Sequence, residues 1–165
     1  MTLYLIRHAQ ADERGPQYPD DSKRPLVDKG FKQVKSLVRA LKALGITVDQ
    51  LFSSPYTRAA QTAEPLLPQL KKGRHIHYLD HLATDDYAQL LVDVKERITK
   101  NDKTIAFVGH EPYLGELAVY LLTGDKNNLR MIFKKAAWLE LSGELEPSQM
   151  ALETFVPASV YKNIK

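Results

Sequence analysis

Residues 3–9 read Leu-Tyr-Leu-Ile-Arg-His-Ala, so four apolar residues are followed at once by an arginine and a histidine. Residues 3–6 favour β structure and do not alternate with polar residues, which predicts a strand buried on both faces. In a sheet covered by helices, the residues after such a strand reach the sheet edge where ligands bind. We therefore expect Arg7 and His8 at this edge, although an Arg-His pair at a strand end can also mark an ordinary surface boundary.

Two later segments repeat this arrangement. Residues 48–54 predict a second strand, and Pro-Tyr-Thr-Arg at 55–58 opens a helix after it. Residues 104–108 predict a third strand, which is followed by Gly-His-Glu-Pro at 109–112. Strands separated by helices form parallel sheets, whose carboxyl ends lie along one edge. Arg58 and His110 are therefore expected beside Arg7 and His8.

The remaining elements complete an α/β pattern. Residues 28–44 predict a helix, because apolar residues recur at three- and four-residue spacing; Asp28 is expected to cap it and Gly45 to end it. Further helices are expected from Tyr56, at 85–98 and at 112–122, and further strands at 75–79, 129–133, 136–141 and 149–155. This order predicts a single domain over residues 1–165, a three-layer α/β/α sandwich with a mostly parallel central sheet.

Composition narrows the class of protein. The 165 residues are 44% hydrophobic and 26% charged, which is typical of a globular chain rather than a disordered one. A net charge of +3 is too small to indicate nucleic-acid binding, and Lys71–Arg74 and Lys134-Lys135 are interpreted as solvated surface. There is no cysteine, no secretion signal and no apolar run near the ~18 residues of a membrane span. We expect a cytoplasmic protein with neither nucleic acid nor membrane as partner.

Three motifs resemble one known family. They are Leu-Ile-Arg-His at 5–8, Ser-Ser-Pro-Tyr-Thr-Arg-Ala-Ala-Gln-Thr-Ala at 53–63 and Val-Gly-His-Glu-Pro at 108–112. In this order they resemble the histidine phosphatase (phosphoglycerate mutase-like) superfamily. The short chain and Arg-Pro-Leu-Val-Asp-Lys-Gly at 24–30 are most similar to its small phosphohistidine phosphatase branch, the SixA type. The resemblance implies a phosphoglycerate mutase-like fold and phosphatase activity.

The residue types suit phosphoryl transfer. Arginine forks grip phosphate oxygens, so Arg7 and Arg58 could form a clamp, and a neutral imidazole can attack phosphorus. Position and resemblance make His8 the expected nucleophile, with His110 stabilising the pentacoordinate state. Ser53 and Thr57 could also contact phosphate, although Ser-Ser-Pro is a common strand-to-helix turn. No cofactor and no metal is expected; His75, His77 and His81 are interpreted as exposed strand and loop residues.

A difference from the superfamily pattern bears on the substrate. Larger members resemble one another in having a glutamate acid after the third strand, whereas His81 stands at that place here. An alkoxide leaving group needs such an acid, but a phosphoimidazole needs less help, which favours phosphohistidine. Asp80, His81, Asp85 or Asp86 could supply a proton instead, or could be ordinary loop residues.

The sequence therefore favours hydrolysis of phosphohistidine on a partner protein, such as a phosphotransfer domain or phosphocarrier, with inorganic phosphate as product. The short connections between the motifs predict an open site that would suit such a partner. Two alternatives stay open: a broad-specificity phosphomonoesterase of the same superfamily, and a non-catalytic phosphate-binding module.

Overall fold

A six-stranded mixed sheet forms the centre of the molecule in the computed structural model, which describes residues 1–162. The strands, in the spatial order β3-β2-β4-β1-β5-β6, are β1 (Thr2–Arg7), β2 (Gln50–Ser53), β3 (Ile76–Tyr78), β4 (Thr104–Gly109), β5 (Trp138–Gly143) and β6 (Met150–Val156). The first four strands of this order are parallel to one another. Strand β5 pairs antiparallel with β1, and β6 pairs antiparallel with β5. The predicted α/β class with a mostly parallel sheet is confirmed; of the predicted domain, residues 163–165 lie outside the described part.

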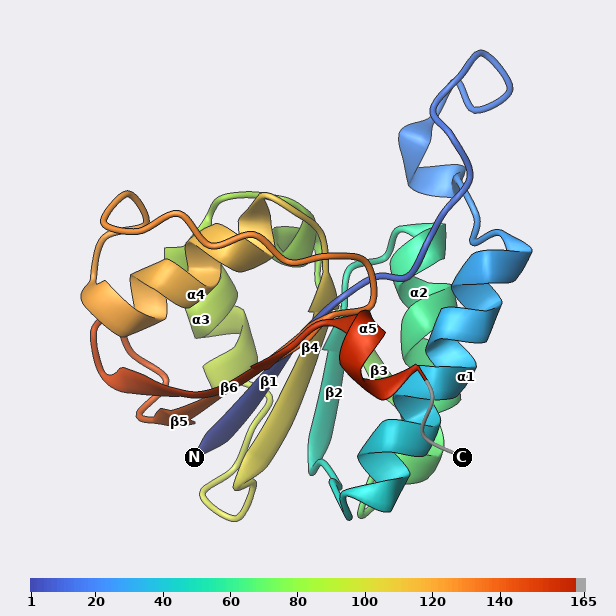
Figure 1. Cartoon of the computed structure of the whole chain (residues 1–165). Helices are drawn as coiled ribbons and strands as arrows, with labels where there is room; N and C mark the ends of the chain where they lie inside the picture. The colour runs from blue at the N-terminus through green and yellow to red at the C-terminus, as the bar shows by residue number, and fades with distance from the viewer. Residues whose placement is uncertain (163–165) are drawn as a thin grey trace.

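Strand β1 shows why the sheet is covered on both faces. Leu3 and Leu5 point into one core cluster, with residues of α3 (Tyr87–Lys95) and α4 (Tyr113–Thr123). Tyr4 and Ile6 point to the opposite face, into a second cluster with α1 (Asp28–Ala43) and α2 (Thr57–Ala63). Because successive side chains alternate across a strand, an unbroken apolar run requires cover on both sides. Figure 1 shows the resulting three layers, with α3 and α4 on one face and α1 and α2 on the other.

The helices follow the predicted order with shifted ends. Helix α1 ends at Ala43, and Gly45, which follows the C-cap residue Leu44, has a φ of +66°, the left-handed conformation expected at the helix stop. The predicted cap at Asp28 is wrong: Val27 is the N-cap residue, and Asp28 is already the first helical residue. Helix α3 is shorter than the predicted 85–98 at both ends. It starts at Tyr87, because the Asp86 carboxylate caps it by accepting from the Gln89 N–H, and it ends at Lys95. The other helical segments are η1 (Asp21–Lys23), η2 (Glu64–Gln69), η3 (Asp80–Ala83) and α5 (Ala158–Tyr161).

The strand predicted at 129–133 is absent, and this part of the prediction is wrong. Residues 129–133 form an irregular connection between α4 and β5, and Leu129 and Ile132 are exposed. Side chains, rather than a neighbouring strand, bond the peptide groups of Phe133. Residues 129–133 therefore form no strand in spite of their β-forming composition.

Two connections lie over the carboxyl edge of the parallel strands. One follows β1 and leads through η1 to α1, and the other is the segment 124–137 between α4 and β5; in Figure 1 both lie above the sheet. Gly30 permits close packing of the first one, since a Cβ there would lie 2.1 Å from the Gln10 carbonyl oxygen. Across residues 1–162, the structure contains no helix of the length and apolarity that a membrane crossing requires.

Candidate active site

The four residues singled out from the sequence meet at this edge. Arg7 is the last residue of β1, His8 follows it, Arg58 lies in the first turn of α2, and His110 follows β4. The His8 N–H donates to the Gly109 carbonyl at 3.0 Å, which continues the pairing of β1 with β4 past the strand ends. The ring centroids of His8 and His110 are 5.0 Å apart. The structure therefore brings together side chains that are distant in the chain.

The ring of His8 is held in a defined orientation. Its Nδ1 lies 2.7 Å from the Ala9 carbonyl oxygen, so Nδ1 carries the proton and Nε2 keeps its lone pair. Only 3% of His8 is exposed, and this burial lowers its pKa strongly, with the positive charge of Lys135 adding to the effect. A neutral imidazole with a free Nε2 is the form that can attack phosphorus.

His110 is oriented by Ser54. The Oγ of Ser54 lies 2.8 Å from Nε2 of His110 and accepts from the Tyr56 N–H at 3.2 Å. The Ser54 hydroxyl has one hydrogen to donate, and its donation to Nε2 leaves the proton of neutral His110 on Nδ1. Burial lowers the pKa of His110 to about 3, and the nearby Arg58 charge adds to this shift. His110 is therefore a neutral hydrogen-bond donor near neutral pH.

Arg58 is held by hydrogen bonds at its guanidinium group and at its backbone carbonyl. Its two terminal nitrogens donate to Asp21, to the backbone oxygen at 2.7 Å and to Oδ2 at 2.9 Å. Its backbone oxygen accepts from the hydroxyl of Thr62, which itself accepts from the Ala9 N–H at 3.1 Å. Thr62 thus joins Ala9, the residue after His8, to the helix that carries Arg58.

Three buried nitrogens in this cluster lack a hydrogen-bond partner. Within residues 1–162, the buried side-chain nitrogen and oxygen atoms without a partner are Nε of Arg7, Nε of Arg58 and Nδ1 of His110. All belong to the candidate site, and an unsatisfied buried donor normally costs about 1–3 kcal/mol. Donors left unsatisfied in a cationic cluster are what an anion-binding site requires.

The structure adds a residue that the sequence interpretation missed. Nζ of Lys135 lies 3.3 Å from Nε2 of His8, so the interpretation of Lys134-Lys135 as solvated surface is wrong for Lys135, although Lys134 is exposed. Burial lowers the pKa of Lys135 to about 8, with the charge of Arg7 adding to the shift. Because β5 is antiparallel to β1, the residues that precede β5 lie at the end of β1. Recognising that pairing would have indicated Lys135.

Ser53 and Thr57 are placed differently from the four central residues. The Ser53 hydroxyl is fully buried and donates to the Ser54 carbonyl at 2.9 Å, whereas the Ser54 hydroxyl contacts His110. Thr57 is the first residue of α2 and is partly buried. A phosphate contact from Ser53 or Thr57 stays a prediction.

Three of the four possible proton donors, His81, Asp85 and Asp86, are engaged in local contacts. Nδ1 of His81 lies 2.7 Å from the Asp93 carboxylate, and Asp85 pairs with Lys126 at 3.0 Å. Asp86 caps α3, and Asp80 is exposed at the start of η3. These contacts are those of loop and cap residues.

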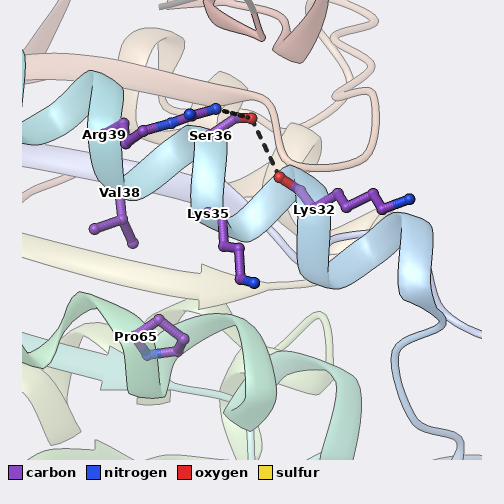
Figure 2. Close-up of a pocket in the computed structure, with 6 residues that line it drawn as sticks. All are labelled: Lys32, Lys35, Ser36, Val38, Arg39 and Pro65. Atoms are coloured by element: carbon purple, nitrogen blue, oxygen red, sulfur yellow. Dashed lines mark hydrogen bonds between the residues drawn. The ribbon is translucent and has the colours of Figure 1, made fainter. Parts of the chain in front are cut away.

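A groove elsewhere on the surface is separate from this cluster. It has a volume of about 460 Å³, lies between α1 and η2, and is lined by Lys32, Lys35, Ser36, Val38, Arg39 and Pro65. Figure 2 shows Arg39 hydrogen-bonded to Ser36, whose hydroxyl reaches the Lys32 carbonyl. None of the four central residues lines this groove.

Comparisons with known proteins agree with the motifs. The sequence profile of the histidine phosphatase superfamily (branch 1) matches residues 3–90. An uncharacterized protein of Picosynechococcus sp. is 32% identical over 142 residues, which cover 86% of this chain and 84% of the relative. The phosphohistidine phosphatase SixA of Escherichia coli is 24% identical over 126 residues, 76% of each chain.

A solved structure shows the same fold. The structure of the protein histidine phosphatase SixA complexed with tungstate superposes with a TM-score of 0.82 at 20% identity, covering 97% of this chain and 99% of that one. Together with the profile match and the His8 and His110 cluster, this agreement leads to one conclusion: the chain belongs to the histidine phosphatase superfamily, branch 1, a superfamily of phosphatases.

Proposed function

We propose that this protein hydrolyses phosphohistidine on a partner protein, through a covalent intermediate on His8. The observation that carries the proposal is the arrangement around Nε2 of His8. Nε2 is a neutral, buried ring nitrogen that carries no proton, and its lone pair faces the ammonium group of Lys135 at 3.3 Å. It lies among cationic and N–H groups, and three buried nitrogens of these groups lack partners within residues 1–162. This arrangement supports attack on a phosphoryl group whose oxygens those donors would bind.

The first step transfers the phosphoryl group to the protein. The lone pair on Nε2 of His8 forms a bond to phosphorus, and the P–N bond of the substrate breaks. Its electron pair goes to the departing ring nitrogen, and a proton on the other ring nitrogen of the substrate makes the leaving group a neutral imidazole. Arg7, Arg58 and the Nδ1–H of His110 stabilise the charge on the equatorial oxygens.

The second step releases inorganic phosphate. Water attacks the phosphorus of the phosphohistidine, the bond to Nε2 breaks, and its electron pair returns to the ring of His8. The bond from Nδ1–H to the Ala9 carbonyl lets this ring leave as neutral imidazole. The proton lost by water passes to the phosphate product.

The absence of a positioned acid supports phosphohistidine over phosphate esters. His81 is paired with Asp93, Asp85 is paired with Lys126, and Asp86 caps α3, so these three groups are engaged in other contacts, whereas Asp80 is exposed at the start of η3. A departing imidazole does not need that acid. The likeness to proteins named as SixA phosphohistidine phosphatases points the same way, and a phosphotransfer domain or phosphocarrier is the proposed partner.

Trapping the intermediate tests the catalytic step. The protein is mixed with a ³²P-labelled phosphotransfer domain and quenched in alkali, in which phosphohistidine survives. Wild-type protein and the exposed-residue control His75→Ala should carry label, and His8→Ala should carry none. If the wild type remains unlabelled and binds phosphate as His8→Ala does, the protein is a phosphate-binding module instead.

Competition between substrates tests the specificity. The values of kcat/KM are compared for a phosphohistidine-bearing phosphocarrier and for a series of sugar phosphates. We expect the phosphocarrier to be preferred by at least about 100-fold, because no positioned acid assists an alkoxide. A preference for the sugar phosphates would establish the phosphomonoesterase alternative. Turnover of p-nitrophenyl phosphate does not discriminate, since its leaving group needs no acid.

A further inference from the structure

We infer that Lys135 is a catalytic residue whose ammonium group moves from Nε2 of His8 to an equatorial oxygen of the phosphoryl group during transfer. The inference rests on the nucleophilic role of His8 in the proposed function. It adds a cation to the two arginines already expected from the sequence.

The contact with His8 defines which atom donates. A lysine ammonium has three N–H donors and no acceptor, so across the 3.3 Å between Nζ and Nε2 the lysine donates and the imidazole accepts. The bond from Nδ1–H of His8 to the Ala9 carbonyl requires the same tautomer. Lys135 therefore marks the direction of the lone pair that attacks phosphorus.

The segment that carries Lys135 is anchored on the site itself. The Phe133 N–H donates to the Glu111 carboxylate at 2.9 Å, and the Phe133 carbonyl accepts from Nη1 of Arg7. Gly115 allows the segment to lie against α4, because a Cβ there would be 2.2 Å from the Met131 carbonyl oxygen. These contacts fix the backbone two residues before Lys135.

The residue after Lys135 is fixed as well. Ala136 has a φ of +59°, a left-handed conformation that is unfavourable for alanine, and its N–H donates to the His8 carbonyl at 3.3 Å. The hydroxyl of the buried Tyr161 donates to the Ala136 carbonyl. A turn held at both ends against the nucleophile's own backbone is expected where the side chain between them has a function.

The charges around Lys135 favour an anion next to it. The charges of Arg7 from β1, Arg24 from the connection before α1 and Arg58 from α2 lower the pKa of Lys135, and the Asp21 carboxylate acts in the opposite direction. The charge of Lys135 in turn acts to lower the pKa values of His8, His110 and Glu111. A phosphoryl group with up to two negative charges would relieve the repulsion among these cations.

The position also restricts the role. In an in-line displacement the leaving atom lies opposite Nε2 across the phosphorus, whereas Nζ of Lys135 lies on the side of Nε2. Lys135 can therefore bind an equatorial oxygen without protonating the leaving group, and no proton is transferred. This role is compatible with a phosphoimidazole substrate that needs no acid.

The test compares Lys135→Met and Lys135→Arg with Lys134→Met, in which the exposed neighbouring lysine is changed. Thermal melting first establishes that each variant is folded, and calorimetric titration with inorganic phosphate then measures the dissociation constant. We expect Lys135→Met to weaken phosphate binding by about 10- to 100-fold, the effect of one charge-assisted hydrogen bond. Lys135→Arg should recover at least part of the affinity, and Lys134→Met should bind as the wild type does.

Ring nitrogen chemical shifts of His8 provide a second measurement. The ammonium disfavours a second proton on the ring, so Lys135→Met should raise the pKa of His8 relative to both wild type and Lys134→Met. This titration reports whether the charge of Lys135 acts on the ring of His8, whereas the phosphate affinity reports whether the ammonium group binds the phosphoryl oxygens. Unchanged phosphate affinity in folded Lys135→Met would overturn the inference, whatever the His8 titration shows.

These results are separable from the proposed function. Loss of phosphate binding in Lys135→Met supports the inference even if the wild type does not hydrolyse phosphohistidine. Conversely, wild-type phosphohistidine hydrolysis with unaltered phosphate affinity in Lys135→Met refutes the inference alone.

Discussion

The hydroxyl of Ser54 lies 2.8 Å from Nε2 of His110, which joins the residue after β2 to the residue after β4. Both residues are nearly fully buried, so water does not readily replace this contact. The bond fixes the ring of His110 and leaves Nδ1 available to an anion. Ser54 thus positions the ring of His110, which the proposed function makes a catalytic group.

Ser54→Ala should lower kcat by about tenfold, because His110 loses the bond that orients it. Ser53→Ala is the informative comparison, since the Ser53 hydroxyl contacts only a carbonyl in the structure and should affect stability more than kcat. Turnover of a phosphohistidine substrate and thermal melting are measured for both variants. A larger loss of kcat in Ser53→Ala would instead favour the predicted phosphate contact of Ser53.

Thr62→Val should lower both stability and activity. The variant keeps the shape of the buried side chain but removes the hydroxyl that bridges the Ala9 N–H and the Arg58 carbonyl. An unsatisfied buried donor costs about 1–3 kcal/mol of unfolding free energy, which denaturant titration measures. Thr62→Ser retains the hydroxyl and should recover most of the activity; equal losses in the two variants would point to packing instead.

Unfolding free energy should fall as the pH drops below 6.5. The pKa of His110 is lowered from 6.5 to about 3 by burial, so between these values the unfolded chain binds the proton and the folded protein does not. His110 thus contributes a slope of up to about 1.4 kcal/mol per pH unit in that window, with stability rising toward neutral pH. Urea titrations of His110→Gln should show a shallower slope than the wild type, and an identical slope would contradict the shift.

Turnover should decline as the pH rises through about 8. Burial and neighbouring cations lower the pKa of Lys135 to about 8, so its ammonium charge is present below this pH and is lost above it. The pKa of His8 is lowered too, so the proposed nucleophile does not titrate in this range. In a profile of kcat from pH 6 to 10, Lys135→Arg should remove the alkaline decline, and its persistence would exclude Lys135 as the cause.

Glu111 should act through the backbone that it holds. Glu111→Ala removes the acceptor of the Phe133 N–H and should weaken phosphate binding several-fold, because the segment that carries Lys135 is released. Glu111→Gln keeps a side-chain oxygen at that position and should stay close to wild type. Phosphate titration of the two variants separates the hydrogen bond from the charge, since loss of the negative charge alone would strengthen phosphate binding in both variants.

Local sequence patterns determined much of the fold and the positions of the four central site residues. The unbroken apolar run at 3–6 required cover on both faces of β1, and residues at strand ends placed Arg7, His8, Arg58 and His110 at one edge. Both predictions depend on short-range periodicity and on the geometry of parallel sheets. The helix stop at Gly45 was also predictable from the local sequence, because a left-handed φ favours glycine.

Tertiary structure alone decided what completes the site. A β-forming composition at 129–133 indicated a strand, but the Phe133 peptide is bonded by Arg7 and Glu111, which lie more than 20 residues away in the chain. Ser54 rather than Ser53 contacts His110, and Lys135 rather than Lys134 contacts His8. Neighbouring residues of the same type have the same local propensity, so only the register of distant segments determines which of the two contacts a histidine of the site.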